Sequence, residues 1–240
     1  MRDQLILLPG WAYGPAALQP LCEALTELDP DLDVVIEPLP ELADPEAWLD
    51  ELDRRLPDDS WLAGWSLGGM LAAQLAARRL DSCRGLVTIT SNPCFRARPQ
   101  WPEAMAAEIF DAFQEAFRLD PEETLKRFRL LCSRGGYDPR TLARQLEVSQ
   151  SDSTPAVLEA GLRLLAELDG RGALHGYFGP QMHLFAGGDA LVPSTACDAL
   201  RRWMPGVEAE LIASTSHALP LERPDDVAAT IAAFIKSKAE

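Results

Sequence analysis

Ser66 lies in the segment Gly-Trp-Ser-Leu-Gly, residues 64–68, where an apolar run gives way to a helical pattern. A serine on a sharp strand-to-helix turn can act as a nucleophile, because the turn exposes its hydroxyl. The residues two before and two after it then lie too close to neighbouring backbone to carry side chains, and Gly64 and Gly68 meet that demand. The segment therefore predicts a reactive serine in an acyl-transfer site.

A serine hydroxyl needs a base to remove its proton, and the chain has three histidines. His217 follows the last predicted strand and precedes the last predicted helix, so its loop opens at the same carboxyl edge as Ser66. His175 falls in a predicted linker, and His183 falls within an apolar strand, where packing or an edge hydrogen bond is expected. We therefore expect His217 to be the base, with an ordinary surface-loop histidine as the alternative.

The base needs a carboxylate that orients it and stabilises the imidazolium. Asp189 follows the apolar run Met-His-Leu-Phe-Ala-Gly-Gly, again at the carboxyl end of a predicted strand. Asp198 is the competing candidate, but it falls within a helical pattern. We therefore expect Asp189 in this role, and the order Ser66, Asp189, His217 matches the order found on α/β-hydrolase sheets.

An oxyanion formed by attack on an ester needs two hydrogen-bond donors. The N–H of Leu67, at the start of the helix after Ser66, is the first candidate. The second is expected in the loop after the first strand, residues 7–14, where Gly10 permits a tight turn and the N–H of Trp11 is free to donate. An ordinary glycine turn is the alternative interpretation of this loop.

Short apolar strands alternate with helical patterns along most of the chain, which favours a mostly parallel sheet with helices on both faces. Residues 92–179 break this rhythm and contain only helical patterns. We therefore expect an α/β core formed by residues 1–91 and 180–240, with an all-helical cap, residues 92–179, inserted into it. Strands are predicted at 4–8, 33–37, 61–64, 85–90, 182–187 and 207–213, and the core helices at 15–28, 45–56, 67–79, 194–204 and 224–236.

Composition limits the classes of function. The formal net charge of −15 disfavours general binding to nucleic acid or to anionic membranes. The five cysteines are scattered without metal-ligand spacing, so neither zinc nor a disulfide framework is indicated. Few apolar residues precede Pro9, too few for an export signal or a membrane span. We expect a cytoplasmic protein that uses no metal.

Several segments carry a more specific resemblance: GWSLGG, GLVTITSNPCFRARPQWPEAM, ETLKRFRLL and AVLEAGLRLLAELD. Together they resemble the pimeloyl-acyl-carrier-protein methyl ester esterases of biotin synthesis, the BioH family, from about Trp61 onward. The GxSxG pattern alone identifies only the α/β-hydrolase superfamily, whereas the cap segments are more selective. The resemblance implies an α/β-hydrolase fold with a helical cap. It also implies hydrolysis of the methyl ester of pimeloyl on acyl carrier protein, with release of methanol and without a cofactor.

The resemblance also assigns site residues by position. It places Ser66, Asp189 and His217 in a catalytic triad and the N–H groups of Trp11 and Leu67 in the oxyanion hole. It further implies that Trp11, Trp65 and Phe128 line the pocket for the acyl chain. The chain departs from the family where Pro9-Gly10 replaces the usual His-Gly of the oxyanion loop.

In the family, arginines of the cap bind the acidic carrier protein. Arg127, Arg140 and Arg144 match such positions, but Glu123 stands where a further arginine is expected. Residues 118–144 carry a net charge of +3, whereas the remainder of the chain carries −18. Arg140 and Arg144 are four apart on a predicted helix and so share a face. We expect a monomer that docks the carrier here, with a merely solvated cap surface as the alternative.

Two other functions are compatible with these residues. Triad chemistry does not select the leaving group, so a broad carboxylesterase or thioesterase acting on small acyl compounds is possible. A noncatalytic binding protein of hydrolase fold is the other alternative. The complete set of triad residues with intact glycines disfavours that second alternative.

Overall fold

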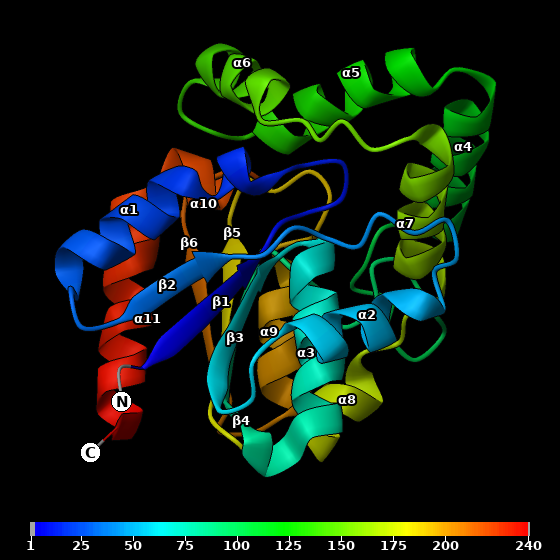
Figure 1. The fold of residues 1–240 in the computed structure, drawn as a ribbon. Helices are drawn as coiled ribbons and strands as arrows, with labels where there is room; N and C mark the ends of the chain where they lie inside the picture. The colour runs from blue at the N-terminus through cyan, green and yellow to red at the C-terminus, as the bar shows by residue number, and fades with distance from the viewer. Residues whose placement is uncertain (1–2, 240) are drawn as a thin grey trace.

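The central element is a parallel β-sheet. The structure, a computed structural model, describes residues 3–239, and within them the strands lie in the order β2-β1-β3-β4-β5-β6 with every neighbouring pair parallel. Figure 1 shows the sheet flanked by helices. The α/β architecture predicted from the sequence is confirmed. The strands are β1 (Gln4–Leu8), β2 (Asp33–Ile36), β3 (Ser60–Trp65), β4 (Cys83–Ile89), β5 (Gln181–Ala186) and β6 (Glu208–Ile212).

Burial explains why the central strands are mostly apolar. β1, β3, β4 and β5 are covered on both faces and almost wholly buried, whereas the edge strands β2 and β6 are partly exposed. On one face α1 (Gln19–Leu28) packs against α11 (Pro224–Ala239). The other face carries α2 (Ala47–Arg55), α3 (Leu67–Arg79), α8 (Arg171–Gly176) and α9 (Thr195–Trp203).

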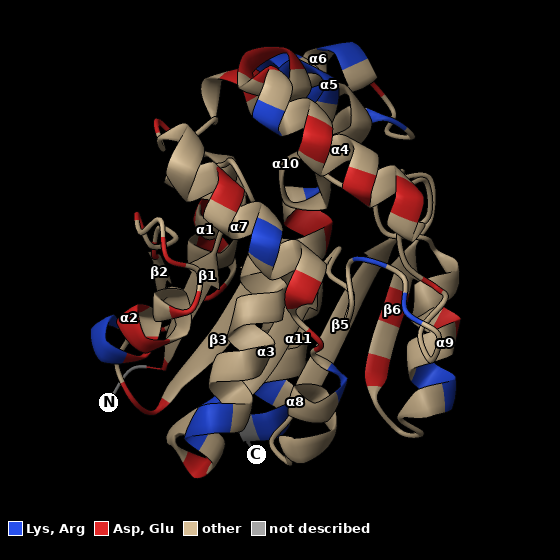
Figure 2. Cartoon of the chain, turned by 90° about the vertical axis from the view of Figure 1, so that its right-hand side faces the viewer, with Lys and Arg blue, Asp and Glu red and all other residues tan. Residues whose placement is uncertain are grey.

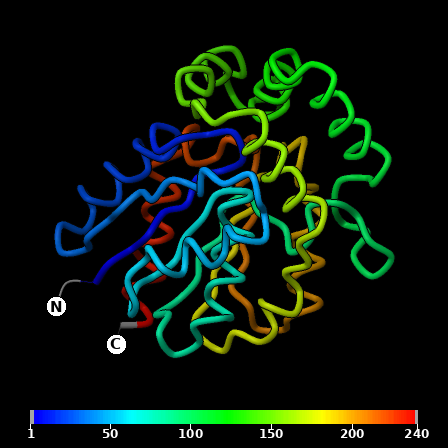
Figure 3. The backbone as a smooth tube through the Cα atoms, turned by 45° about the vertical axis from the view of Figure 1, so that its right-hand side comes forward, coloured from blue at the N-terminus to red at the C-terminus, as the bar shows by residue number. Residues whose placement is uncertain are grey.

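Between β4 and β5 the chain forms helices that lie above the carboxyl ends of the strands (Figure 3). They are α4 (Ala107–Leu119), α5 (Pro121–Ser133), α6 (Pro139–Val148) and α7 (Pro155–Glu167). The last three each begin at a proline, which suits the first helical position because its missing N–H is not needed there. The preceding side chain accepts a hydrogen bond from a first-turn N–H and so caps each helix; these residues are Asp120, Asp138 and Thr154.

The limits of the cap, residues 92–179, stay a prediction. The short helix α8, which ends this segment, packs beside α3 rather than with the helices above the sheet. This packing favours a cap that ends shortly after α7. No helix of residues 3–239 has the length and apolar character needed to cross a membrane.

Two local features differ from the sequence prediction. The helix expected over 15–28 is divided into a 3-10 turn, Pro15–Ala17, and α1, because Pro20 has no N–H and is tolerated only in a first helical turn. The helix α10 (Leu219–Glu222) was not predicted, since one helical turn is too short to show periodicity. It lies directly beyond the loop of His217.

Packing between β3 and β4 provides a test of the core. Gly85 is opposite Trp61, and a Cβ at Gly85 would lie 2.0 Å from the Trp61 ring, which itself packs edge-on against Phe234 of α11. We expect Gly85→Ala to lower the free energy of unfolding by about 1–3 kcal/mol, because the indole must move in a close-packed interior. Urea unfolding measures this change.

The matched control is Gly172→Ala in α8, where a Cβ meets no atom within 4 Å. We expect this variant to be neutral or more stable by up to about 1 kcal/mol, because alanine favours helix. Equal destabilisation by both substitutions would contradict the packing described for Trp61.

Candidate active site

Ser66 sits between the end of β3 and the start of α3 with φ 55° and ψ −118°. Its backbone is held by β4 and the residues after it: the Ser66 N–H donates to the Ile89 carbonyl (2.9 Å), and the Ser66 carbonyl accepts from Ser91 Oγ (2.8 Å). A Cβ at Gly64 would lie 2.2 Å from the Gly68 carbonyl carbon, and one at Gly68 would lie 2.3 Å from the Leu8 oxygen. Glycine is therefore required on both sides of this turn.

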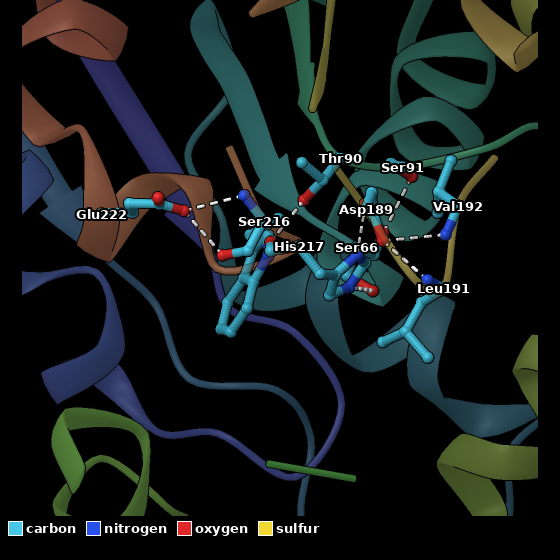
Figure 4. A network of polar contacts seen from close by, with 10 residues as sticks. Ser66, Thr90, Ser91, Asp189, Leu191, Val192, Ser216, His217 and Glu222 are labelled. Atoms are coloured by element: carbon cyan, nitrogen blue, oxygen red, sulfur yellow. Dashed lines mark hydrogen bonds and ion pairs between the residues drawn. The ribbon is translucent and has the colours of Figure 1, made fainter. Parts of the chain in front are cut away.

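The side chains of Ser66, His217 and Asp189 form one hydrogen-bonded chain (Figure 4). Ser66 Oγ lies 2.9 Å from His217 Nε2, and His217 Nδ1 lies 2.8 Å from Asp189 Oδ2. All three are buried. With the ring proton on Nδ1 donated to Asp189, Nε2 is free to accept the serine proton. This arrangement can generate a nucleophile from the hydroxyl.

Backbone and side-chain donors orient the two partners of Ser66. Asp189 Oδ1 accepts from the N–H groups of Leu191 (2.7 Å) and Val192 (3.0 Å), which leaves Oδ2 facing the imidazole. The His217 carbonyl accepts from Trp65 Nε1 (2.8 Å) and from Thr90 Oγ1 (3.0 Å). The loop of His217 is thereby attached to β3 and to the end of β4.

The competing residues lie elsewhere. Asp198 is exposed on α9 and forms an ion pair with Arg201. His175 is in α8, beside Trp203. His183 is buried in β5 with Nδ1 2.7 Å from Thr88 Oγ1, and desolvation lowers its pKa to about 4. None of the three takes part in the hydrogen bonds that link Ser66, His217 and Asp189.

The N–H groups of Trp11 and Leu67 are both available near Ser66. Within residues 3–239 neither donates a hydrogen bond to another protein group. Leu67 is the first residue of α3, whose N–H has no acceptor inside the helix. Gly10 brings the first loop close, since a Cβ on it would lie 3.4 Å from Ser66 Cβ. The two donors can therefore bind an oxygen beside the serine.

An apolar cavity opens over Ser66 beneath α4, α5 and α7. Trp11 lies in its wall, with its indole N–H bonded to the Leu158 carbonyl (2.8 Å) and its ring against Phe113 and Phe128. Among residues 3–239, no charged side chain lines the cavity. The lining residues are Trp11, Phe95, Met105, Ile109, Phe110, Phe113, Phe128, Leu131, Leu162, Leu165 and Leu191.

The structure places two of the three residues that the resemblance had assigned to the acyl pocket in the cavity wall, and one outside it. Phe128 lines the cavity, as does Trp11. Trp65 does not; its ring packs between Tyr13 and His217, and its N–H is engaged by the His217 carbonyl. The sequence prediction missed Phe110 and Phe113, although phenylalanines recurring at helical spacing along 110–117 were a visible signal.

The arginines expected to bind the carrier lie on the outside of the cap. Figure 2 shows basic residues on α5 and α6 at the top of the molecule. Arg140 and Arg144 are exposed on α6, and neither forms an ion pair with a described residue. Arg127 is exposed on α5 and pairs with Glu123 (3.2 Å). Two of the three cations are thus available to an external partner.

In the part of the chain that the structure describes, no group of three or more His, Cys, Asp or Glu side chains is arranged to hold a metal ion.

Comparison with known proteins adds independent information. The sequence pattern of the alpha/beta hydrolase family matches residues 5–230. The chain is 36% identical to the pimeloyl-acyl-carrier-protein methyl ester esterase of Aromatoleum aromaticum, over 96% of this chain and 97% of that protein. It is 34% identical to the biotin biosynthesis bifunctional protein BioHC of Cellvibrio japonicus, over 99% of this chain. The match spans only 48% of that bifunctional protein.

Solved structures agree on the fold. A bromoperoxidase from Bacillus anthracis superposes with a TM-score of 0.84 at 16% identity, covering 98% of this chain and 92% of that one. A hydrolase from Oleispira antarctica superposes with a TM-score of 0.85 at 14% identity, covering 98% and 92%. At such low identity these likenesses concern the fold alone.

The full-length relatives confirm the resemblance first visible in GWSLGG and the cap segments. The chain belongs to the alpha/beta hydrolase family and, within it, to the pimeloyl-acyl-carrier-protein methyl ester esterases, a family of ester hydrolases.

Proposed function

We propose that this chain hydrolyses the methyl ester of a pimeloyl group carried on acyl carrier protein, with Ser66 as nucleophile. The observation that carries the chemistry is the chain of contacts from Ser66 Oγ through His217 to Asp189, at 2.9 and 2.8 Å. The substrate is inferred from the full-length relatives, which are pimeloyl-acyl-carrier-protein methyl ester esterases. The reaction belongs, on this proposal, to biotin synthesis.

The first step is acylation of the serine. His217 Nε2 takes the hydroxyl proton as Ser66 Oγ bonds to the ester carbonyl carbon, and Asp189 stabilises the resulting imidazolium. The carbonyl oxygen becomes an oxyanion, bound by the N–H groups of Trp11 and Leu67; one such donor can lower the barrier by about 3 kcal/mol. When the C–O bond to the methoxy group breaks, His217 returns the proton and methanol leaves.

The second step releases the acid. A water molecule gives a proton to His217 and attacks the acyl-serine carbonyl, forming a second oxyanion in the same place. Collapse of this intermediate breaks the bond to Ser66 Oγ, which takes the proton back from His217. The products are the free carboxyl group and the original enzyme.

The cavity over Ser66 supports the proposal that an uncharged acyl chain binds there. The described residues around the cavity are almost all apolar and none of them is charged, so each methylene group buried there contributes about 0.8 kcal/mol. A methyl ester enters without a charge, whereas a free carboxylate would lose hydration and meet no cation. The pocket thus fits the esterified end of a dicarboxylic chain.

The charge on the cap supports the proposal that the acyl carrier protein is the partner. Arg140 and Arg144 are exposed and unpaired within the described residues, on a cap whose segment 118–144 carries +3 against −18 elsewhere. An acidic protein is attracted to this surface and repelled by the rest of the chain. The monomeric state and the cytoplasmic location expected from the sequence stay predictions.

Substitution of the triad tests the chemistry on a small p-nitrophenyl ester. We expect Ser66→Ala to lower kcat by about 10⁴-fold or more, and Asp189→Asn by up to about 10⁴-fold, because the imidazole then loses its orientation. The matched control is Asp198→Asn, which should retain the wild-type rate. Loss of activity in the Asp198 variant with a normal rate in the Asp189 variant would refute the assignment.

Charge reversal on α6 tests the carrier. We expect Arg140→Glu with Arg144→Glu to lower kcat/KM on the carrier-linked methyl ester by about tenfold or more, while hydrolysis of a small free ester stays within about twofold. The matched control is the double variant Arg54→Glu and Lys236→Glu. Both residues are exposed, on α2 and α11, so this variant makes the same change in charge away from the cap.

Equal loss on both substrates would refute docking at α6. Wild-type protein that cleaves short esters but not the carrier-linked methyl ester would instead indicate a broad carboxylesterase.

A further inference from the structure

Glu222, the last residue of α10, has no part in the triad but holds the loop that carries it. Its Oε2 accepts from both the N–H and the Oγ–H of Ser216, each at 2.7 Å. Ser216 is fully buried and directly precedes His217. Figure 4 shows the carboxylate of Glu222 bonded to Ser216 at the root of the His217 side chain.

The same carboxylate reaches the cap. Its Oε1 accepts from the N–H of Tyr137 (2.8 Å), in the turn between α5 and α6. Neighbouring Arg223 pairs with Asp226 (3.0 Å), and no described cation forms an ion pair with Glu222. Its charge is therefore satisfied by these donors, and hydrogen bonds to an ionised group are about twice as strong as neutral ones.

The turn between α5 and α6 also touches the loop of Asp189. Gly135 has φ +89°, and a Cβ on it would lie 2.0 Å from the Gly188 carbonyl oxygen. At the end of α5, the Cys132 carbonyl accepts from the N–H of Ala218, which follows His217 (3.2 Å). The end of α5 and the turn that follows it therefore contact both loops that carry the partners of Ser66.

We propose that Glu222 is a positioning residue, which joins the loop of His217 to the α5–α6 turn of the cap and so keeps the imidazole within reach of Ser66. The inference rests on the proposed function, since the position of His217 matters only if His217 is the base. A displacement of about 1 Å at a reacting group can cost about 100-fold in rate. Loss of the carboxylate leaves the Ser216 and Tyr137 donors without an acceptor. We therefore expect the loop of His217 to shift.

The position of α6 connects the role of Glu222 to the docking of the carrier. The helix begins at Pro139, just beyond Tyr137, and carries Arg140 and Arg144. The contact of Glu222 therefore connects the helix proposed for docking with the loop of the base. A carrier seated on α6 acts on the same turn that Glu222 holds.

Truncation of Glu222 and restoration of the lost carboxylate by acetate together test this role. Glu222 lines an open groove of about 440 Å³ between α6 and α10, so a small carboxylate can reach the site. We expect Glu222→Ala to lower kcat on a p-nitrophenyl ester by about 10- to 100-fold, with KM within about twofold. Added acetate should recover kcat severalfold in this variant and leave the wild type unchanged.

Two further variants complete the set. Glu222→Gln keeps the shape and one acceptor for Ser216 but turns an amide donor toward the Tyr137 N–H, so we expect a smaller loss of about threefold to tenfold. Glu210→Ala is the matched control: Glu210 is exposed on β6, and its side chain has no partner among the described residues. We expect wild-type kinetics from it, with or without acetate.

The outcomes separate the two proposals. Loss of activity in Ser66→Ala with wild-type kcat in both Glu222 variants overturns only the positioning role. A fall in kcat for folded Glu222→Ala that acetate does not recover, or that appears equally in KM, also overturns it. Should Glu222→Ala fail to fold, an unchanged kcat in Glu222→Gln overturns the role. Full activity in Ser66→Ala refutes the proposed function itself.

Discussion

The site depends on one constraint: the backbone of Ser66 must adopt a conformation that serine rarely occupies. At φ 55° and ψ −118° such strain costs about 1–3 kcal/mol, and it persists only because the surroundings hold it. Gly64 and Gly68 allow β3, α3 and the first loop to approach within distances that no side chain permits. The bonds from Ser66 to Ile89 and Ser91 attach the turn to β4 and the residues after it. The hydroxyl and the N–H of Leu67 are thereby presented at one edge of the sheet.

The parallel sheet brings the other groups to that edge. Because every strand runs in the same direction, the loops after β3, β5 and β6 all open beneath the cap, and they carry Ser66, Asp189 and His217. The helices inserted between β4 and β5 add what the core lacks, an apolar roof on the inside and exposed arginines on the outside. On the proposed function, the core supplies the chemistry and the cap selects the substrate.

Much of this arrangement was predictable because it is encoded locally. A glycine pattern between a strand and a helix marks Ser66, and positions just after apolar strands mark Asp189 and His217. The parallel sheet followed from the alternation of strands and helices and is confirmed. The orientation of Trp65 and the contacts of Glu222 were not predictable, since both depend on segments distant in sequence: the Trp65 indole meets the His217 carbonyl, and Glu222 meets the α5–α6 turn. The cap aromatics gave a periodic signal, but periodicity alone does not tell a pocket wall from an ordinary core face.

A crystal structure of the protein inactivated by a phosphonate analogue of a pimelate monoester tests the role of Ser66 most directly. If Ser66 is the nucleophile, phosphorus is bonded to Ser66 Oγ, with the phosphoryl oxygen within hydrogen-bonding distance of the N–H groups of Trp11 and Leu67. We also expect His217 Nε2 beside the remaining ester oxygen and the methylene chain in the cavity under α4 and α5. A label on any other residue, or a phosphoryl oxygen directed away from both amides, would contradict these assignments.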